Sequence, residues 1–176
     1  MTGHLPTRAT ALSAALLFTT LIVTPLSGQG AGPERRALQK RVEELYTAGK
    51  YDSARIAAEQ TLRHAEAHAV PGHPDIAESM SDLAVMDTYT NRLDAADSLY
   101  RLAIAMLEVA GDSTAGLLAI VLGNHANLHF SAGRYRDAEG LYARAAAALE
   151  HAADTLSPQY SITVFNLANT IRAQGR

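Results

Sequence analysis

Two groups of histidines have the spacing that metal chemistry on a helix would require. His125 and His129 are four residues apart, so on a helix their imidazoles would lie on one face, where they could bind one zinc ion. His64 and His68 repeat this spacing, and His73 follows closely. The residues between the first pair include no glutamate, so the zinc-protease motif is absent. We therefore expect packed or hydrogen-bonded histidines, with no bound metal and no cofactor.

The glutamate between His64 and His68 is not part of a catalytic motif either. Glu66, between His64 and His68, recurs at equal intervals as Glu108 and Glu150, so it belongs to a repeat. The sequence has no glycine-rich phosphate loop, no Gly-x-Ser-x-Gly elbow and no acid pair outside the repeat pattern. We predict that the protein is not an enzyme and has no catalytic residues.

Composition narrows the class of protein and of partner. The 176 residues are 48% hydrophobic and 19% charged, which is typical of a folded globular chain. The net charge of −3 and the lack of a basic stripe argue against nucleic acid as a partner. Without cysteine, disulfides, thiolate metal sites and a lipid-attachment cysteine are excluded.

The N-terminal segment has the pattern of an export signal. Residues 9–33 contain no charged side chain, and the apolar run 11–23 follows Arg8. This run is shorter than the roughly 20 residues of a membrane-spanning helix, so we interpret residues 1–30 as a signal peptide. An uncleaved N-terminal anchor is the alternative, and otherwise no membrane contact is expected. The protein is then exported, to a bacterial periplasm or the extracellular space.

The rest of the chain is a repeat array with a period of 42. Turn residues stand at this spacing (91 − 49, 133 − 91 and 175 − 133) at Gly49, Asn91, Gly133 and Gly175, and each is followed by a basic residue. One unit cannot bury its apolar face alone, so a fixed period implies that units stack into a solenoid. The array covers residues 31–176, with repeats at about 34–74, 75–116 and 117–158 and a partial repeat at 159–176.

Apolar residues at helical spacing on both sides of each turn predict two helices per unit. Alanine recurs as Ala84, Ala126 and Ala168, where two helices would approach closely. Each unit's first helix is expected to begin at a breaker, namely Pro74, Gly116 or Pro158, and Ser157 is a candidate N-cap. Seven helices are predicted, over residues 34–48, 52–69, 75–90, 93–110, 117–132, 136–153 and 159–174.

The repeat resembles the tetratricopeptide repeat (TPR). In the third unit the matching residues are Ala126, Gly133, Tyr135, Ala138, Tyr142 and Ala145. The period of 42 exceeds the usual value of about 34 and, with Gly72-His73-Pro74-Asp75, is similar to the kinesin-light-chain-like subclass. Asp87 and His129 depart from the pattern, where the family commonly has tyrosine. The resemblance implies an all-α, right-handed superhelical solenoid of antiparallel helix hairpins.

The resemblance also implies a ligand groove lined by side chains of the first helices. Aromatic residues there would supply contact area, and amides could hold a peptide backbone. The alternative is that this mixed polar face is simply solvated. The positions are Glu43, Tyr46, Val85, Tyr89, Asn127, Phe130, Asn169 and Arg172.

These patterns predict a protein-interaction scaffold that binds a peptide or protein segment in its concave groove. The sequence does not identify the partner. Ile162, Val164, Phe165, Leu167 and Ile171 give the last helix a broad apolar surface. We interpret that surface, and the end of the chain at a turn, as signs of a fragment of a larger TPR protein. A self-associating assembly protein is the other alternative.

Overall fold

The computed structural model describes residues 32–176, which form seven α-helices and no strand. All seven predicted helices are confirmed, with ends that differ by at most two residues. The predicted signal peptide lies outside the described residues. The helices are α1 (Pro33–Thr47), α2 (Tyr51–His68), α3 (Pro74–Tyr89), α4 (Leu93–Ala110), α5 (Ala115–Ser131), α6 (Tyr135–His151) and α7 (Pro158–Ala173).

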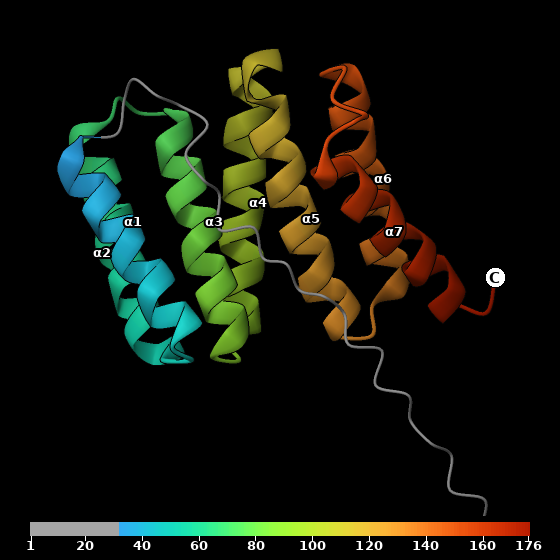
Figure 1. The fold of residues 1–176 in the computed structure, drawn as a ribbon, viewed down its shortest axis with the longest axis horizontal. Coiled ribbons are helices and arrows are strands. Elements are labelled where there is room, and N and C mark those ends of the chain that lie inside the picture. The colour runs from blue at the N-terminus through green and yellow to red at the C-terminus, as the bar shows by residue number, and fades with distance from the viewer. Residues whose placement is uncertain (1–31) are drawn as a thin grey trace, which may run out of the picture.

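The helices pack as consecutive hairpins in a two-layered array. Figure 1 shows α1, α3, α5 and α7 in the layer nearer the viewer, with α2, α4 and α6 behind. Each helix packs on its neighbours in the sequence, and α3 also contacts α5. None of the helices in residues 32–176 is long and apolar enough to cross a membrane.

The predicted turn positions end the first helix of each unit in the same way. Gly49, Gly133 and Gly175 have φ angles of 69°, 73° and 79°, and Asn91 has 60°, a value that asparagine tolerates better than most residues. Directly after Gly133, the Arg134 N–H donates to the His129 carbonyl at 2.9 Å. This left-handed C-cap is what the spacing of glycine and asparagine encodes.

The starts of the first helices are less uniform than predicted. Ser157 caps α7 as expected, because its hydroxyl accepts from the Tyr160 N–H at 3.1 Å. Gly116, in contrast, lies inside the first turn of α5 rather than before it. A 3₁₀ turn, η1 (Asp112–Thr114), leads into that helix. The Thr114 hydroxyl bonds to the Gly111 carbonyl at 2.7 Å, which holds the turn in place.

The core lies between the two layers and depends on small residues. Ala84 and Ala126 are fully buried, and the rings of Tyr100 and Tyr142 are buried in the hairpins that contain them. Because alanine projects only a methyl group, the paired helices can approach closely there. Ala168 is exposed, since no helix among the described residues covers that face of α7.

A buried ion network fastens α1 to α3, and the sequence did not predict it. Arg35 is only 2% exposed; its Nη1 lies 3.1 Å from Asp75 Oδ2, and its Nη2 donates to Glu78. Burial raises the pKa of Glu78 despite the opposing charge of Arg35. Burial and the charge of Glu78 raise the pKa of Asp82, one turn further on, to about 8.

Candidate functional site

A pocket of about 350 Å³ opens between α3 and α5. It lies between the first helices of two consecutive units, where the groove was expected, and three of the predicted groove residues line it: Val85, Tyr89 and Asn127. The remaining lining residues are Thr88, Asn91, Leu93, Tyr100, Asn124, Leu128, Ser131 and Ala132.

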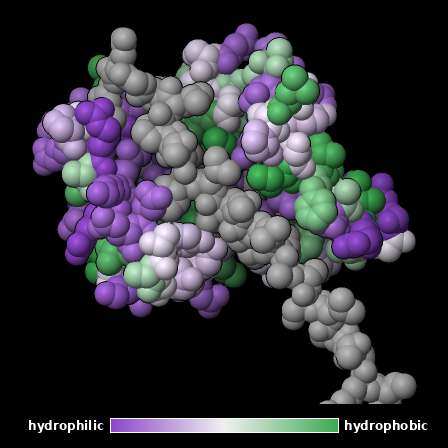
Figure 2. All heavy atoms as spheres, in the orientation of Figure 1, coloured by the Kyte–Doolittle hydropathy of each residue, from purple (hydrophilic) through white to green (hydrophobic). Residues whose placement is uncertain are grey.

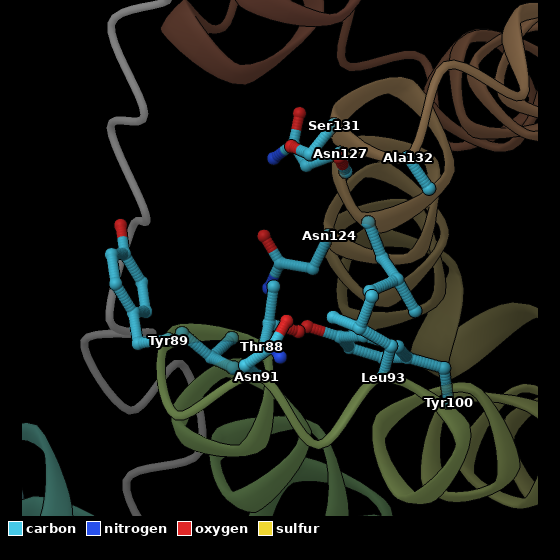
Figure 3. A pocket seen from close by; sticks show the side chains of 11 residues that line it. Thr88, Tyr89, Asn91, Leu93, Tyr100, Asn124, Asn127, Ser131 and Ala132 are labelled. Carbon is cyan, nitrogen blue, oxygen red and sulfur yellow. Dashed lines mark hydrogen bonds between the residues drawn. The ribbon is translucent and has the colours of Figure 1, made fainter.

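One face of α5 supplies the polar groups on its side of the pocket. Asn124, Asn127 and Ser131 follow the spacing i, i+3, i+7, so they share one helix face. Figure 3 shows their side chains directed into the space between α5 and α3. The Tyr142 hydroxyl of α6 donates to Asn127 Oδ1, which fixes the orientation of that amide. The NH₂ of Asn127 is therefore its hydrogen-bonding group toward the pocket.

The floor of the pocket is a buried tyrosine. The Tyr100 side chain is 1% exposed, and its hydroxyl bonds to Thr88 of α3. Burial raises the pKa of Tyr100, so the phenol stays protonated at neutral pH. Tyr142 stays protonated for the same reason, since burial raises its pKa as well. Neither tyrosine therefore adds charge to the pocket wall, and each is held by a hydrogen bond, Tyr100 to Thr88 and Tyr142 to Asn127.

Three tyrosines extend the pocket toward α1. The hydroxyls of Tyr46 and Tyr89 lie 2.8 Å apart, and their rings meet edge to face at 5.2 Å. Tyr51, at the start of α2, stacks on Tyr89 with ring centroids 4.8 Å apart. Tyr46, another of the predicted groove residues, thus contacts Tyr89 but does not itself line the pocket.

The other four predicted residues lie apart from the pocket. Glu43 is exposed on α1. The Phe130 ring packs edge to face on Tyr135 at 5.1 Å and contributes to a small core cluster. On α7, an Arg172 amine donates to Asn169 Oδ1 at 3.0 Å. The pocket and its tyrosine extension therefore involve half of the predicted set.

Several pocket residues were not predicted as site residues. Asn124 occupies the same repeat position as Asp82 and Asn166, and this regularity identifies it as part of the repeat but not as part of a groove. Thr88 and Ser131 are short polar residues that do not recur at the same position of the neighbouring units. Tyr51 begins α2, the second helix of its unit, whereas the resemblance placed the groove on first helices.

The two histidine pairs differ in their surroundings. His125 and His129 are 4% and 8% exposed, and His125 Nε2 lies 2.8 Å from Asp97 Oδ1 of α4. The expectation that these histidines are buried and hydrogen-bonded is therefore confirmed. His64 and His68 stack at 4.2 Å near the end of α2, and His68 Nδ1 bonds to the His64 carbonyl.

Comparisons with known proteins agree with this architecture. Residues 76–111 match the family model of the tetratricopeptide repeat. The TPR-like repeats of a kinesin-light-chain-like protein from Podosopora anserina, and of a variant of it, are each 17% identical to this chain, with a TM-score of 0.71 over 81% of it and 67% of theirs. BtubC (BKLC) from P. vanneervenii is 19% identical, with a TM-score of 0.68 over 79% of this chain and 55% of its own.

No curated protein matches the chain in sequence. The present chain spans about half of BtubC and two thirds of the Podosopora anserina repeats. TPR solenoids are in general protein–protein interaction scaffolds. The described residues therefore have the solenoid fold of the kinesin-light-chain-like TPR proteins, with a match to the tetratricopeptide repeat at residues 76–111.

Proposed function

We propose that this protein is a non-enzymatic scaffold that holds an extended peptide segment in the pocket between α3 and α5. The observation that carries the proposal is the pair of asparagine amides, Asn124 and Asn127, on the pocket face of α5. Asn124 and Asn127 face Thr88 and Tyr89 across a pocket of about 350 Å³. The Asn124 amide offers both a donor and an acceptor, and the Asn127 amide offers its NH₂, which match the N–H and C=O of a peptide main chain.

The pocket lining indicates the chemistry of the segment. None of the eleven side chains that line the pocket carries a charge. Val85, Leu128 and the Tyr89 ring provide apolar contact, whereas the amides provide hydrogen bonds. We therefore expect an uncharged segment with one apolar or aromatic side chain seated between α3 and α5 and its main chain held by the asparagines.

The tyrosine cluster extends this surface along the array. Tyr46, Tyr51 and Tyr89 present adjoining rings, and Tyr51 is 37% exposed. Aromatic side chains contribute large contact areas at interfaces for little lost conformational entropy. Glu43, Phe130, Asn169 and Arg172 would then flank the segment rather than anchor it.

A displayed library of random peptides, selected against the full chain, tests the proposal. Affinities of the selected peptides are then measured by fluorescence anisotropy for the wild type and for Asn124→Ala. Loss of the amide should weaken binding about tenfold, the effect of losing about one hydrogen bond to the partner. The Asn124 side chain lines the pocket rather than the core between the layers, so its replacement should leave the fold intact.

Arg63→Ala is the matched control. Arg63 is 60% exposed on α2, and its contact is an ion pair with Glu59 on the same helix. This variant should bind the selected peptides as the wild type does. A library that yields no binder, or binders that respond to Arg63→Ala and not to Asn124→Ala, would contradict the proposed groove.

Self-association is the second candidate function, and one surface favours it. Val164 and Phe165 of α7 are 40% and 62% exposed. Figure 2 shows hydrophobic residues gathered toward the C-terminal end of the array and hydrophilic ones around α1. If two copies pair through α7, Phe165→Glu should give monomers in sedimentation velocity. The control is Val109→Glu, which should leave the dimer intact because Val109, although 90% exposed, is on α4 and not on α7. A wild type that is monomeric at all concentrations removes this candidate.

We propose export as the setting of this function, on the basis of the apolar run near the N-terminus alone. Mass spectrometry of the protein after expression in a secreting bacterial host tests it. A mature N-terminus between positions 28 and 32 is expected. An intact N-terminus in a membrane fraction would instead favour the anchor.

A further inference from the structure

Three potential metal ligands converge where α4 meets α5. His125 Nε2 lies 2.8 Å from Asp97 Oδ1, His129 Nε2 lies 3.3 Å from the same oxygen, and the two imidazole nitrogens are 3.1 Å apart. All three side chains are at least partly buried. None of the three lines the peptide pocket, although Tyr100, which stacks on His125, does. The inference is therefore independent of the proposed groove.

Hydrogen bonds alone satisfy this cluster poorly. Each Nε2 has a single in-plane site, which holds either a proton or a lone pair. If both histidines donate through Nε2 to Asp97, both Nδ1 atoms carry lone pairs. His125 Nδ1 is then buried without a hydrogen-bond partner among the described residues. The lone pair of His129 Nδ1 would face Asp137 Oδ2, 3.6 Å away, where two acceptors repel each other.

A zinc ion removes the repulsion at His129 Nδ1, while His125 Nδ1 would then carry an N–H that has no hydrogen-bond partner among the described residues. When Nε2 of each ring binds a metal, the proton moves to Nδ1, and His129 Nδ1–H then points its positive end toward the Asp137 carboxylate. Zinc ligands lie about 2.0–2.2 Å from the metal, and in a tetrahedral site their atoms are about 3.3 Å apart. The three observed separations, 2.8, 3.1 and 3.3 Å, form a slightly compressed face of such a tetrahedron.

The surroundings hold the ligands in position. Arg101 Nε donates to Asp97 Oδ2 at 2.9 Å, which leaves Oδ1 directed at the histidines. The His125 ring stacks on Tyr100 with centroids 5.2 Å apart, so its orientation is fixed by the core. Burial lowers the pKa of His125, and burial together with Arg134 lowers that of His129.

We propose that Asp97, His125 and His129 form a mononuclear zinc site that fastens the second hairpin to the third. Two imidazoles and one carboxylate are a ligand set that suits zinc, and a fourth position would be taken by water. Asp97 is the most accessible ligand, with 21% of its side chain exposed, so zinc would enter from its side. The zinc would link α4 and α5, which belong to different repeats, and would stabilise the junction between them.

The first test uses the full wild-type chain. After treatment with a chelator, it should bind one equivalent of zinc with a dissociation constant at or below about 1 μM, measured by competition with a fluorescent chelator. X-ray absorption at the zinc edge should show two imidazoles and oxygen ligands at about 2.0–2.1 Å. Three imidazoles would assign the metal to His64, His68 and His73 instead and would overturn the proposal. So would the absence of a tightly bound equivalent.

Substitutions locate the site. Asp97→Asn preserves shape and hydrogen bonding and should weaken zinc binding at least tenfold, and His129→Gln at least a hundredfold. The double variant His64→Ala, His68→Ala is the matched control, because it removes a pair with the same spacing but no carboxylate from a neighbouring helix. The control should bind zinc like the wild type. Binding lost in the control but kept in Asp97→Asn would contradict the proposal. Should His129→Gln fail to fold, the absorption measurement on the wild type still decides.

Discussion

At two junctions between successive hairpins, the same two repeat positions meet but carry different side chains. At the first, Arg55 of α2 meets Asp87 of α3, with Arg55 Nε 2.8 Å from Asp87 Oδ1. At the second, the equivalent positions one repeat later are Asp97 of α4 and His129 of α5. In the first junction the acid is Asp87, on the first helix of its unit. In the second junction the acid is Asp97, on the second helix of the preceding unit.

The difference shows what the repeat does and does not specify. Both junctions bring together side chains at the same separation in the sequence, so the period determines which residues meet. The first contact is a hydrogen-bonded pair of opposite charges. The second adds His125, which stands where the first junction has Leu83, and so brings together three atoms that can share a metal. Departures from the repeat, rather than the repeat itself, therefore mark the chemistry.

Charge reversal should break the first junction with the largest effect. In Arg55→Glu, a carboxylate would face Asp87, whose side chain is 4% exposed, so a buried charge would lose its partner and gain a like neighbour. We expect the free energy of unfolding to fall by about 3 kcal/mol, measured by urea denaturation.

Arg63→Glu serves as the control for this prediction. This variant reverses the charge at Arg63, which is on the same helix but is 60% exposed and pairs with Glu59, 39% exposed. Its expected cost is below about 1 kcal/mol. Equal losses for Arg55→Glu and Arg63→Glu would show that the junction pair adds no specific stability.

His125→Leu should make the second junction resemble the first. The change installs the residue found at Leu83 and removes an imidazole whose Nδ1 has no hydrogen-bond partner among the described residues. Without metal, stability should stay equal or rise by about 1 kcal/mol, because a poorly satisfied polar group is replaced by an apolar one. The stabilisation of the wild type by added zinc should disappear. Urea denaturation with chelator and with excess zinc measures both effects.

The reverse exchange gives the matched comparison. Leu83→His buries an imidazole in a junction with no acid at the position of Asp97, since Arg55 occupies that register. It should destabilise by about 2–3 kcal/mol and confer no zinc dependence. If His125→Leu is equally destabilising in chelator, the histidine is a packing residue with satisfied contacts and the contrast between the junctions fails.

At pH 4, Asp82→Asn should give the smallest effect of these variants, and the effect should grow as the pH rises. It installs the asparagine that stands at Asn124 in the next unit. The folded-state pKa of Asp82 is about 8, against an ordinary value of 3.8. Between these values the unfolded chain has lost a proton that the folded chain keeps, so this group lowers stability as pH rises.

The variant lacks this penalty. Its stability relative to the wild type should therefore increase from pH 4 to pH 8 and then level off, as measured by urea midpoints across this range. A stability difference that stays constant with pH would show that Asp82 titrates normally in the folded protein.

The sequence predicted the backbone better than the site, for a physical reason. Helix periodicity and left-handed caps are local, so Gly133 and Asn91 identified their turns and Ser157 its cap. Arg35 with Glu78, and Asp97 with His125, are contacts between residues 43 and 28 positions apart on different helices, which periodicity does not report. Phe130 matched a groove position in sequence, but its ring turned to Tyr135 because an apolar cluster beside it offered more burial.

Cross-linking from within the pocket tests the central claim, that α3 and α5 hold a peptide segment between them. A photoreactive p-benzoylphenylalanine replaces Ser131, which lines the pocket, or Arg63 on the opposite layer as the control. With a library-selected peptide bound to the full chain, we expect cross-links from position 131 that excess unlabelled peptide suppresses, and none from position 63. Cross-links from position 63 alone, or from neither position despite measurable binding, would contradict the account.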